Sequence, residues 1–246
     1  MALRRLLSSV GVNAPSVETL LERSAIYPGQ QLPVTVVMRG GGADVEVGRL
    51  VVELVVRVEE SEPTETEWNN PQVVTSFQVD RFVLRAGSEV PYKGVLEVPW
   101  GMPLTHVLGA PLKGGRCAVR TTIEIDNAVD KGDFDELQVH GLPVHDAMFR
   151  AFADHGYRFD EAEVKAHWRN HHTLQTLPYC QELEFWYPPA YRNSAQLEMV
   201  LIVTKDMVEV IPGSVGAYQF APATLDHAWW SRWIEHFCEP RWSSAV

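Results

Sequence analysis

Three histidines close together are the clearest candidate metal ligands in the sequence. His167 and His171 stand one helical turn apart, and His172 follows directly. A zinc site needs three or four ligands within tetrahedral reach, usually with cysteine or a carboxylate among them. The cluster lacks the glutamate of an H-E-x-x-H motif. We therefore favour a polar surface loop here, with a metal site as the alternative.

An acidic stretch in the middle of the chain, residues 126–137, offers oxygen ligands of the kind that calcium prefers. Its carboxylates are Asp126, Asp130, Asp133, Asp135 and Glu136. The spacing lacks the glutamate that an EF-hand places twelve residues from its first ligand. We interpret the stretch as a connector that makes charge contacts between two domains, and a solvated linker remains an equal alternative.

The sequence contains no motif for nucleophilic or phosphate chemistry. The segment Gly213–Gly216 follows an expected strand but lacks the spacing of a G-x-S-x-G elbow. Gly40–Gly42 lacks the G-K-[ST] of a phosphate-binding loop and fits a hairpin turn instead. We predict no catalytic residue and no cofactor.

Aromatic residues gather near the C-terminus at helical spacing, after a predicted N-cap at Thr224. Because aromatic side chains dominate interface hot spots, four of them are candidate partner-binding residues. These are Trp229, Trp230, Trp233 and Phe237. The alternative is a helix that packs on its own domain, and it is favoured because three exposed tryptophans would promote aggregation.

Charge and cysteine content exclude several classes of protein. The chain has 21 basic and 32 acidic residues among 246, a formal charge of -11, which disfavours binding to nucleic acid and to anionic lipid. Its three cysteines, Cys117, Cys180 and Cys238, form no C-x-x-C pair, so neither a disulfide framework nor a zinc knuckle is expected. A reducing cytoplasm fits best.

The N-terminus could form a short amphipathic helix over Leu3 to Val10. Docking on the first domain is the favoured interpretation of this segment, and a weak membrane anchor is the alternative. Leu6 and Leu7 are too short an apolar run for a signal peptide. The apolar run from Gln196 to Val203 has only the length of a strand, so a soluble protein is expected.

Alternation of apolar and polar residues predicts an all-β chain with few helices. In the longest run, Leu50, Val52 and Leu54 lie on one face, opposite residues of mixed character. We expect an N-terminal β-sandwich over residues 1–130 and a second one over 131–246. A short helix is expected near 144–156, ended by Gly156, and a tail helix near 225–238.

Two sets of residues resemble a known family. Tyr27–Gln30 before a strand, and Gly87–Tyr92 before another, resemble an arrestin-like N-terminal sandwich. Ile125–Asp133 followed by Leu137–His140 is similar to the bacterial sporulation-control protein family (Spo0M), over most of residues 1–215. The resemblance implies two arrestin-like β-sandwiches in tandem, joined through a polar zone, and a regulatory role without catalysis. The residues matching the family motif in that zone are Asp126, Asp130, Lys131 and Asp133.

We therefore expect a cytoplasmic, non-catalytic regulator or scaffold that contacts a protein partner through sheet edges, loops and the tail. Exposed edges would also allow a homodimer. The alternatives are a metal-dependent β-sandwich enzyme that uses His167, His171 and His172, and a membrane-peripheral adaptor that uses Leu3 to Val10 and Trp229 to Phe237.

Overall fold

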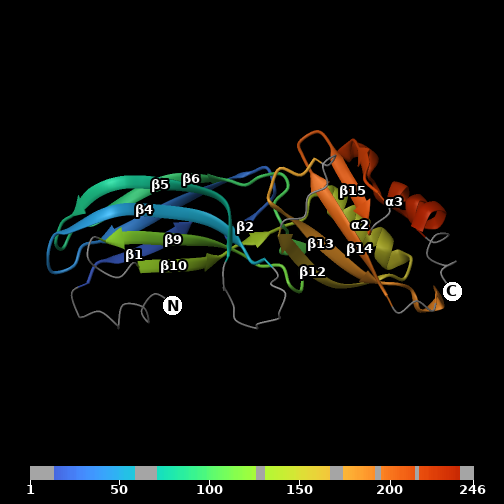
Figure 1. Ribbon diagram of the computed structural model, residues 1–246, viewed down its shortest axis with the longest axis horizontal. Coiled ribbons are helices and arrows are strands. Elements are labelled where there is room, and N and C mark those ends of the chain that lie inside the picture. The colour runs from blue at the N-terminus through green and yellow to red at the C-terminus, as the bar shows by residue number, and fades with distance from the viewer. Residues whose placement is uncertain are drawn as a thin grey trace.

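The computed structural model describes residues 14–58, 71–125, 131–166, 174–191, 195–213 and 216–238, except for the side chains of residues 131, 132, 237 and 238. Two strand-rich bodies lie end to end along the longest axis of the molecule (Figure 1). We call them the first body, with its strands in residues 16–136, and the second body, residues 143–238. The prediction of an all-β fold is confirmed.

Two antiparallel sheets form the first body. One sheet has the order β1 (Ser16–Leu21), β3 (Gln31–Arg39), β6 (Glu89–Glu97). The other has the order β10 (Lys131–Glu136), β9 (Cys117–Ile125), β4 (Val45–Val56), β5 (Gln72–Leu84). The alternation in β4 explains the core, because Leu50, Val52 and Leu54 are fully buried while the residues between them face outward.

Half of the predicted acidic connector is a strand of the first body. Residues 131–136 form β10 and pair with β9, so a domain boundary at residue 130 would separate hydrogen-bonded neighbours. Next along the chain, β11 (Gln138–Val139) pairs in parallel with β2 (Ala25–Ile26). Residues 126–130, which include Asp126 and Asp130, lie outside the described residues. The division into two domains stays a prediction.

A segment that we call the junction segment, residues 98–116, connects β6 to β9 and contacts the second body. It carries a short hairpin of β7 (His106–Val107) and β8 (Ala110–Pro111). The Gln181 amide bonds both to the N–H and to the carbonyl of Leu104, each at 2.8 Å. The Ala162 N–H donates to the carbonyl of Lys113 at 2.8 Å, and Lys113 Nζ lies 2.9 Å from Glu161.

The second body is one antiparallel sheet with helices against it (Figure 1). Its strands, in sheet order, are β12 (Arg158–Ala166), β13 (Tyr179–Trp186), β14 (Gln196–Val203), β15 (Val208–Pro212) and β16 (Tyr218–Phe220). Its helices are α2 (Pro143–Asp154), the 3-10 turns η2 (Pro189–Tyr191) and η3 (Pro222–Thr224), α3 (His227–Trp233) and the π-helix η4 (Ile234–Cys238).

In the described part of the second body, helices α2 and α3 pack on the sheet. The Phe152 ring of α2 lies 4.8 Å from Phe185 of β13 and 6.4 Å from Trp230 of α3, measured between ring centroids. Phe149 packs at 5.2 Å both on Phe159 and on Phe185. These side chains belong to one continuous apolar core that also includes the interior of the first body.

Both predicted helices are present, with one correction at a helix start. Helix α2 begins one residue before the predicted range and is followed by Gly156 at φ +82°, as expected for a helix stop. Helix α3 begins after Asp226, whose Oδ1 accepts the N–H of Trp229 at 2.7 Å. The prediction of Thr224 as the N-cap is therefore wrong, because Thr224 lies in η3.

A turn at Tyr27–Gln30 packs against a tryptophan of the junction segment. The Gln30 N–H donates to the Tyr27 carbonyl at 3.2 Å, and Gly29 takes φ +82°. A Cβ at Gly29 would lie 2.5 Å from the indole of Trp100. Glycine is required here both by the backbone angle and by the close approach of the ring.

Candidate interaction surfaces

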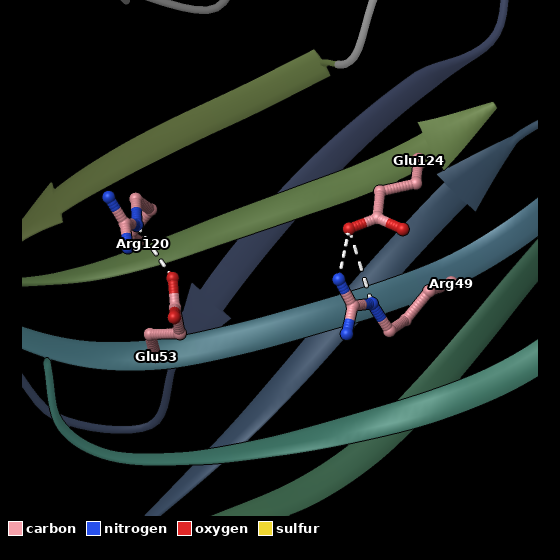
Figure 2. Close-up of polar contacts among 4 residues, drawn as sticks. All are labelled: Arg49, Glu53, Arg120 and Glu124. Atoms are coloured by element: carbon pink, nitrogen blue, oxygen red, sulfur yellow. Dashed lines mark hydrogen bonds and ion pairs between the residues drawn. The ribbon is translucent and has the colours of Figure 1, made fainter.

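Two charge pairs between β4 and β9 lie on the outward face of the four-stranded sheet (Figure 2). Arg49 lies opposite Glu124, with Nη2 and Nε at 2.5 and 3.2 Å from one carboxylate oxygen. Glu53 lies opposite Arg120, whose Nε donates at 2.6 Å. Cross-strand pairs of opposite charge stabilise a sheet, so these two pairs support the pairing of β4 with β9.

A similar contact joins the three strands of the smaller sheet. Arg39, at the end of the central strand β3, reaches Glu18 of β1 and Glu89 of β6, each at 2.8 Å. The two hydrogen bonds raise the pKa of the arginine further, so it stays charged. All three side chains are exposed, which makes the contribution of each pair to stability small.

Exposed apolar side chains lie on the edge strands β5 and β6. Val83 and Val73, near the two ends of β5, are 52% and 41% exposed, and Val90 and Val95 of β6 are also exposed. Across the middle of β5, Phe77 packs over Gly94 of β6, where a Cβ would meet the ring at 2.3 Å. The middle parts of β5 and β6 are therefore in contact, whereas the apolar side chains near the ends of β5 are exposed to water.

Three of the other described edge strands, β6, β12 and β16, are protected or short. Pro91 interrupts the hydrogen-bond donors of β6. The edge of β12 is covered by the junction segment, because Ala162 donates to Lys113 and Gly114 lies against the Ala162 carbonyl. Strand β16 has only three residues. Only β5 combines a length of 13 residues with an absence of proline.

The acidic side chains of β10 lie next to β1 in the first body. Burial is the main cause that raises the pKa of Asp133, and it raises that of Asp135 to about 6, aided by the charges of Asp133 and Glu18. The Phe134 N–H donates to Asp133 at 2.9 Å, and Oδ2 of Asp135 is buried without a partner. The inter-domain role of Asp133 stays a prediction, as does that of Lys131, whose side chain is not described.

The tail tryptophans are placed mostly in the core. Trp230 is fully buried and Trp233 is 8% exposed, whereas Trp229 is half-buried and packs on Phe220 at 4.7 Å. The alternative interpretation, a helix packed on its own domain, matches this placement. Partner binding by these residues stays a prediction, and it would require α3 to leave α2. The side chain of Phe237 lies outside the described part.

Comparison with known proteins decides the family. A family profile described as SpoOM protein matches residues 3–212. The chain belongs to the Spo0M family. It is 26% identical over 211 residues to the sporulation-control protein spo0M of Bacillus subtilis (strain 168), covering 85% of this chain and 78% of that protein. This confirms the resemblance drawn from the residues of the turn and the connector.

A solved structure confirms the fold of this Spo0M family member. The crystal structure of Spo0M from Bacillus subtilis superposes with a TM-score of 0.74 at 23% identity, covering 93% of this chain and 99% of that one. None of the helices in the described ranges is long and apolar enough to cross a bilayer. His167, His171 and His172 lie in residues that the structure does not describe, so the metal site proposed for them remains an untested alternative.

Carboxylates on the second body are the described groups that could hold a metal ion in this Spo0M protein. Two sets share Glu184, and within each set one oxygen per residue lies within 4.8 Å of the others. The sets are Asp160, Glu161 and Glu184, and Glu163, Glu182 and Glu184. Oxygen donors suit calcium or magnesium. Lysines already pair with two of these carboxylates, Lys113 with Glu161 and Lys165 with Glu163.

Local sequence patterns do not reveal this carboxylate cluster or the contacts that join the bodies. Glu163 faces Glu182, and Glu184 faces Glu198, across neighbouring strands, and only the strand register brings these residues together. Burial, followed by the charge of Glu163, raises the pKa of Glu184 to about 7. Gln181, which bonds to Leu104, gave no local signal beyond its place in an alternating strand.

Proposed function

We propose that this Spo0M family member is a non-catalytic regulator that holds a protein partner by adding the partner's extended segment to the edge of β5. Membership of the family supports a regulatory role, because the Bacillus subtilis relative is named for the control of sporulation. The two described cysteines, Cys117 and Cys180, are free and buried, which suits action in a reducing cytoplasm.

The observation that carries this proposal is the character of the β5 edge. An edge strand presents N–H and C=O groups that an extended peptide can pair with, and side-chain contacts then give specificity. Strand β5 is 13 residues long, and near its ends, away from the contact with β6, Val73 and Val83 are exposed and can pack against apolar side chains of the peptide. The length of β5, its lack of proline and its exposed valines favour it as the docking strand over β6, β12 and β16.

The experiment compares partner capture by edge variants. The double variant Val73→Lys, Val83→Lys places a lysine near each end of β5, which should disfavour strand addition. Its fold should stay intact, because both positions are exposed. The matched control is Val95→Lys, an equally exposed change on the proline-containing β6. We expect proteins captured from the native cell, quantified by mass spectrometry, to be lost with the β5 variant and retained with the control.

The same variants distinguish a partner from self-association. If β5 pairs with a second copy of the chain, the wild-type protein should be dimeric by light scattering, and the β5 variant should be monomeric. Capture of the same proteins by the β5 variant and by the control would contradict the proposal. Circular dichroism and thermal melting of all three proteins ensure that lost capture does not reflect lost folding.

A further inference from the structure

Two adjoining hollows lie where the junction segment meets the second body. The inner one is a cavity of about 30 Å³ whose polar lining includes Gln175, Tyr179 and Gln181. The outer one is a cleft of about 270 Å³ between Trp100, the start of α2 and the end of β14. Trp100 and Val203 line both hollows, which therefore share a wall.

Two residues that line the inner cavity, Tyr179 and Gln175, have buried polar atoms without partners. Tyr179 is 2% exposed, and its hydroxyl makes no hydrogen bond within the described residues. The amide nitrogen and oxygen of Gln175 are also buried and unpaired. Gln181, in the same wall, is fully bonded to Leu104. Unpaired buried groups cost free energy, so the three free atoms indicate a place where a hydrogen-bonding group from outside would be stabilised.

The ionisable side chains that line the inner cavity are uncharged near neutral pH. Burial lowers the pKa of His145 to about 4, and its Nδ1 accepts the N–H of Leu142 at 3.1 Å. Burial raises the pKa of Cys180 to about 12 and raises that of Tyr179 as well. A charged group entering this cavity would therefore lose its hydration without meeting a counter-charge, which excludes a carboxylate or an ammonium head.

The outer cleft has fixed apolar walls. Trp100 is held by its close approach to Gly29, and Leu142, Pro143 and Val144 form the first turn of α2. Pro222 closes another side. Lys205 is the charged residue among those lining the cleft, and its side chain is exposed. A volume of about 270 Å³ is close to the lower limit for small-molecule sites, so the cleft suits one ring or a short alkyl chain.

We propose that the cavity and the cleft together bind a small neutral alcohol, with its hydroxyl between Tyr179 and Gln175 and its apolar body against Trp100. The cavity has room for about one water-sized group, which fits a hydroxyl. A hydroxyl both donates and accepts, and so matches the Tyr179 hydroxyl and the Gln175 amide. This ligand site is independent of the β5 edge, since the two share no residue.

The test uses three probes with the same ring, namely benzyl alcohol, toluene and benzoate, titrated into the full-length protein by calorimetry and by amide NMR. We expect benzyl alcohol to bind and to shift the side-chain amide signals of Gln175. Toluene, without the hydroxyl, loses the hydrogen bonds to both residues and should bind about 10- to 100-fold more weakly. Benzoate should not bind. Absence of benzyl alcohol binding, or equal binding of benzoate, would overturn the proposal.

Variants separate this site from a general apolar surface. Tyr179→Phe should reduce the affinity for benzyl alcohol about 3- to 10-fold, the range expected for one hydrogen bond, and, because it removes an unpaired buried hydroxyl, should not lower the melting temperature. Tyr92→Phe, the same change on β6, is the matched control and should bind as the wild type does. Ala223→Trp should fill the cleft and abolish binding of both probes. Unchanged affinity in Tyr179→Phe would also overturn the proposal.

Discussion

At the residue scale, Glu184 is the side chain whose protonation should most affect the second body. It is 9% exposed and faces Glu198 across the strand pair, with Glu161 and Glu163 nearby. Its pKa is about 7 in the folded chain, against 4.5 as the ordinary value. The folded state therefore binds this proton more tightly than the unfolded state. The resulting stabilisation is complete below about pH 4.5 and is lost as the pH rises through about 7.

We predict that Glu184→Gln raises the free energy of unfolding at pH 8 by about 1 kcal/mol, because it removes repulsion between facing carboxylates. Near pH 4.5, where wild-type Glu184 is protonated, the difference should be close to zero. Urea unfolding at both pH values measures it. The contributions of Asp135 and His145 are common to both proteins and cancel in the difference. A difference independent of pH, or one matched by the exposed Glu235→Gln, would contradict the prediction.

At the element scale, α3 holds the second body together through its buried face. Trp230 packs on Phe152 of α2, while Trp229 lies at the margin against Phe220 of β16. We predict that Trp230→Ala lowers the free energy of unfolding by about 3–5 kcal/mol, the usual cost of truncating a fully buried large aromatic residue.

Trp229→Ala is the matched comparison, since it makes the same change one residue earlier on the half-buried side. It should lower the free energy of unfolding by clearly less than Trp230→Ala does, as measured by denaturant titration. If both changes left stability intact and instead abolished capture of a partner, α3 would be an interface and its packing in the free protein would be dispensable.

Secondary structure could be predicted well where it follows from local periodicity. It could be predicted less well where it depends on pairing with a strand elsewhere in the chain. Strand β4 followed from its alternation, because one buried face dictates a period of two. Strand β10 reads KGDFDE, which looks like a loop, and only its hydrogen bonds to β9 make it a strand. The packing of helices on the sheet of the second body was not predictable either, because no local sequence pattern indicates which element packs on a sheet face.

The candidate sites were less predictable than the fold, for the same reason. The family could be inferred from Tyr27–Gln30 and the connector motif, because these residues are contiguous in sequence. The edge position of β5, the carboxylate cluster around Glu184 and the cavity at Tyr179 arise from strand order, register and packing. The burial of Trp230 and Trp233 likewise depends on where α2 lies.

At the scale of the whole molecule, the two bodies share an apolar core and are joined by specific polar contacts in the junction segment. Gln181 satisfies two backbone groups of Leu104, and Lys113 contacts β12. We predict that Gln181→Met lowers the free energy of unfolding by about 1–3 kcal/mol, because it leaves the N–H and carbonyl of Leu104 without these partners.

The control for this prediction is Gln78→Met, the same change at an exposed position on β5, which should alter stability by less than about 0.5 kcal/mol. Both variants should unfold in a single transition if the shared core couples the bodies. Two separate transitions in the wild-type protein, or equal stability of the two variants, would show that the junction does not couple the two parts.

The parallel pair of β2 and β11 has a consequence for biosynthesis. Ala25 pairs with Gln138, so 113 residues separate the partners along the chain. At a translation rate of about 5–20 residues per second, the emerging N-terminal strand waits roughly 6 to 23 seconds for its neighbour. Throughout that interval the nascent polypeptide carries unfinished sheets on the ribosome, and a chaperone that shields them would determine how much of the product folds.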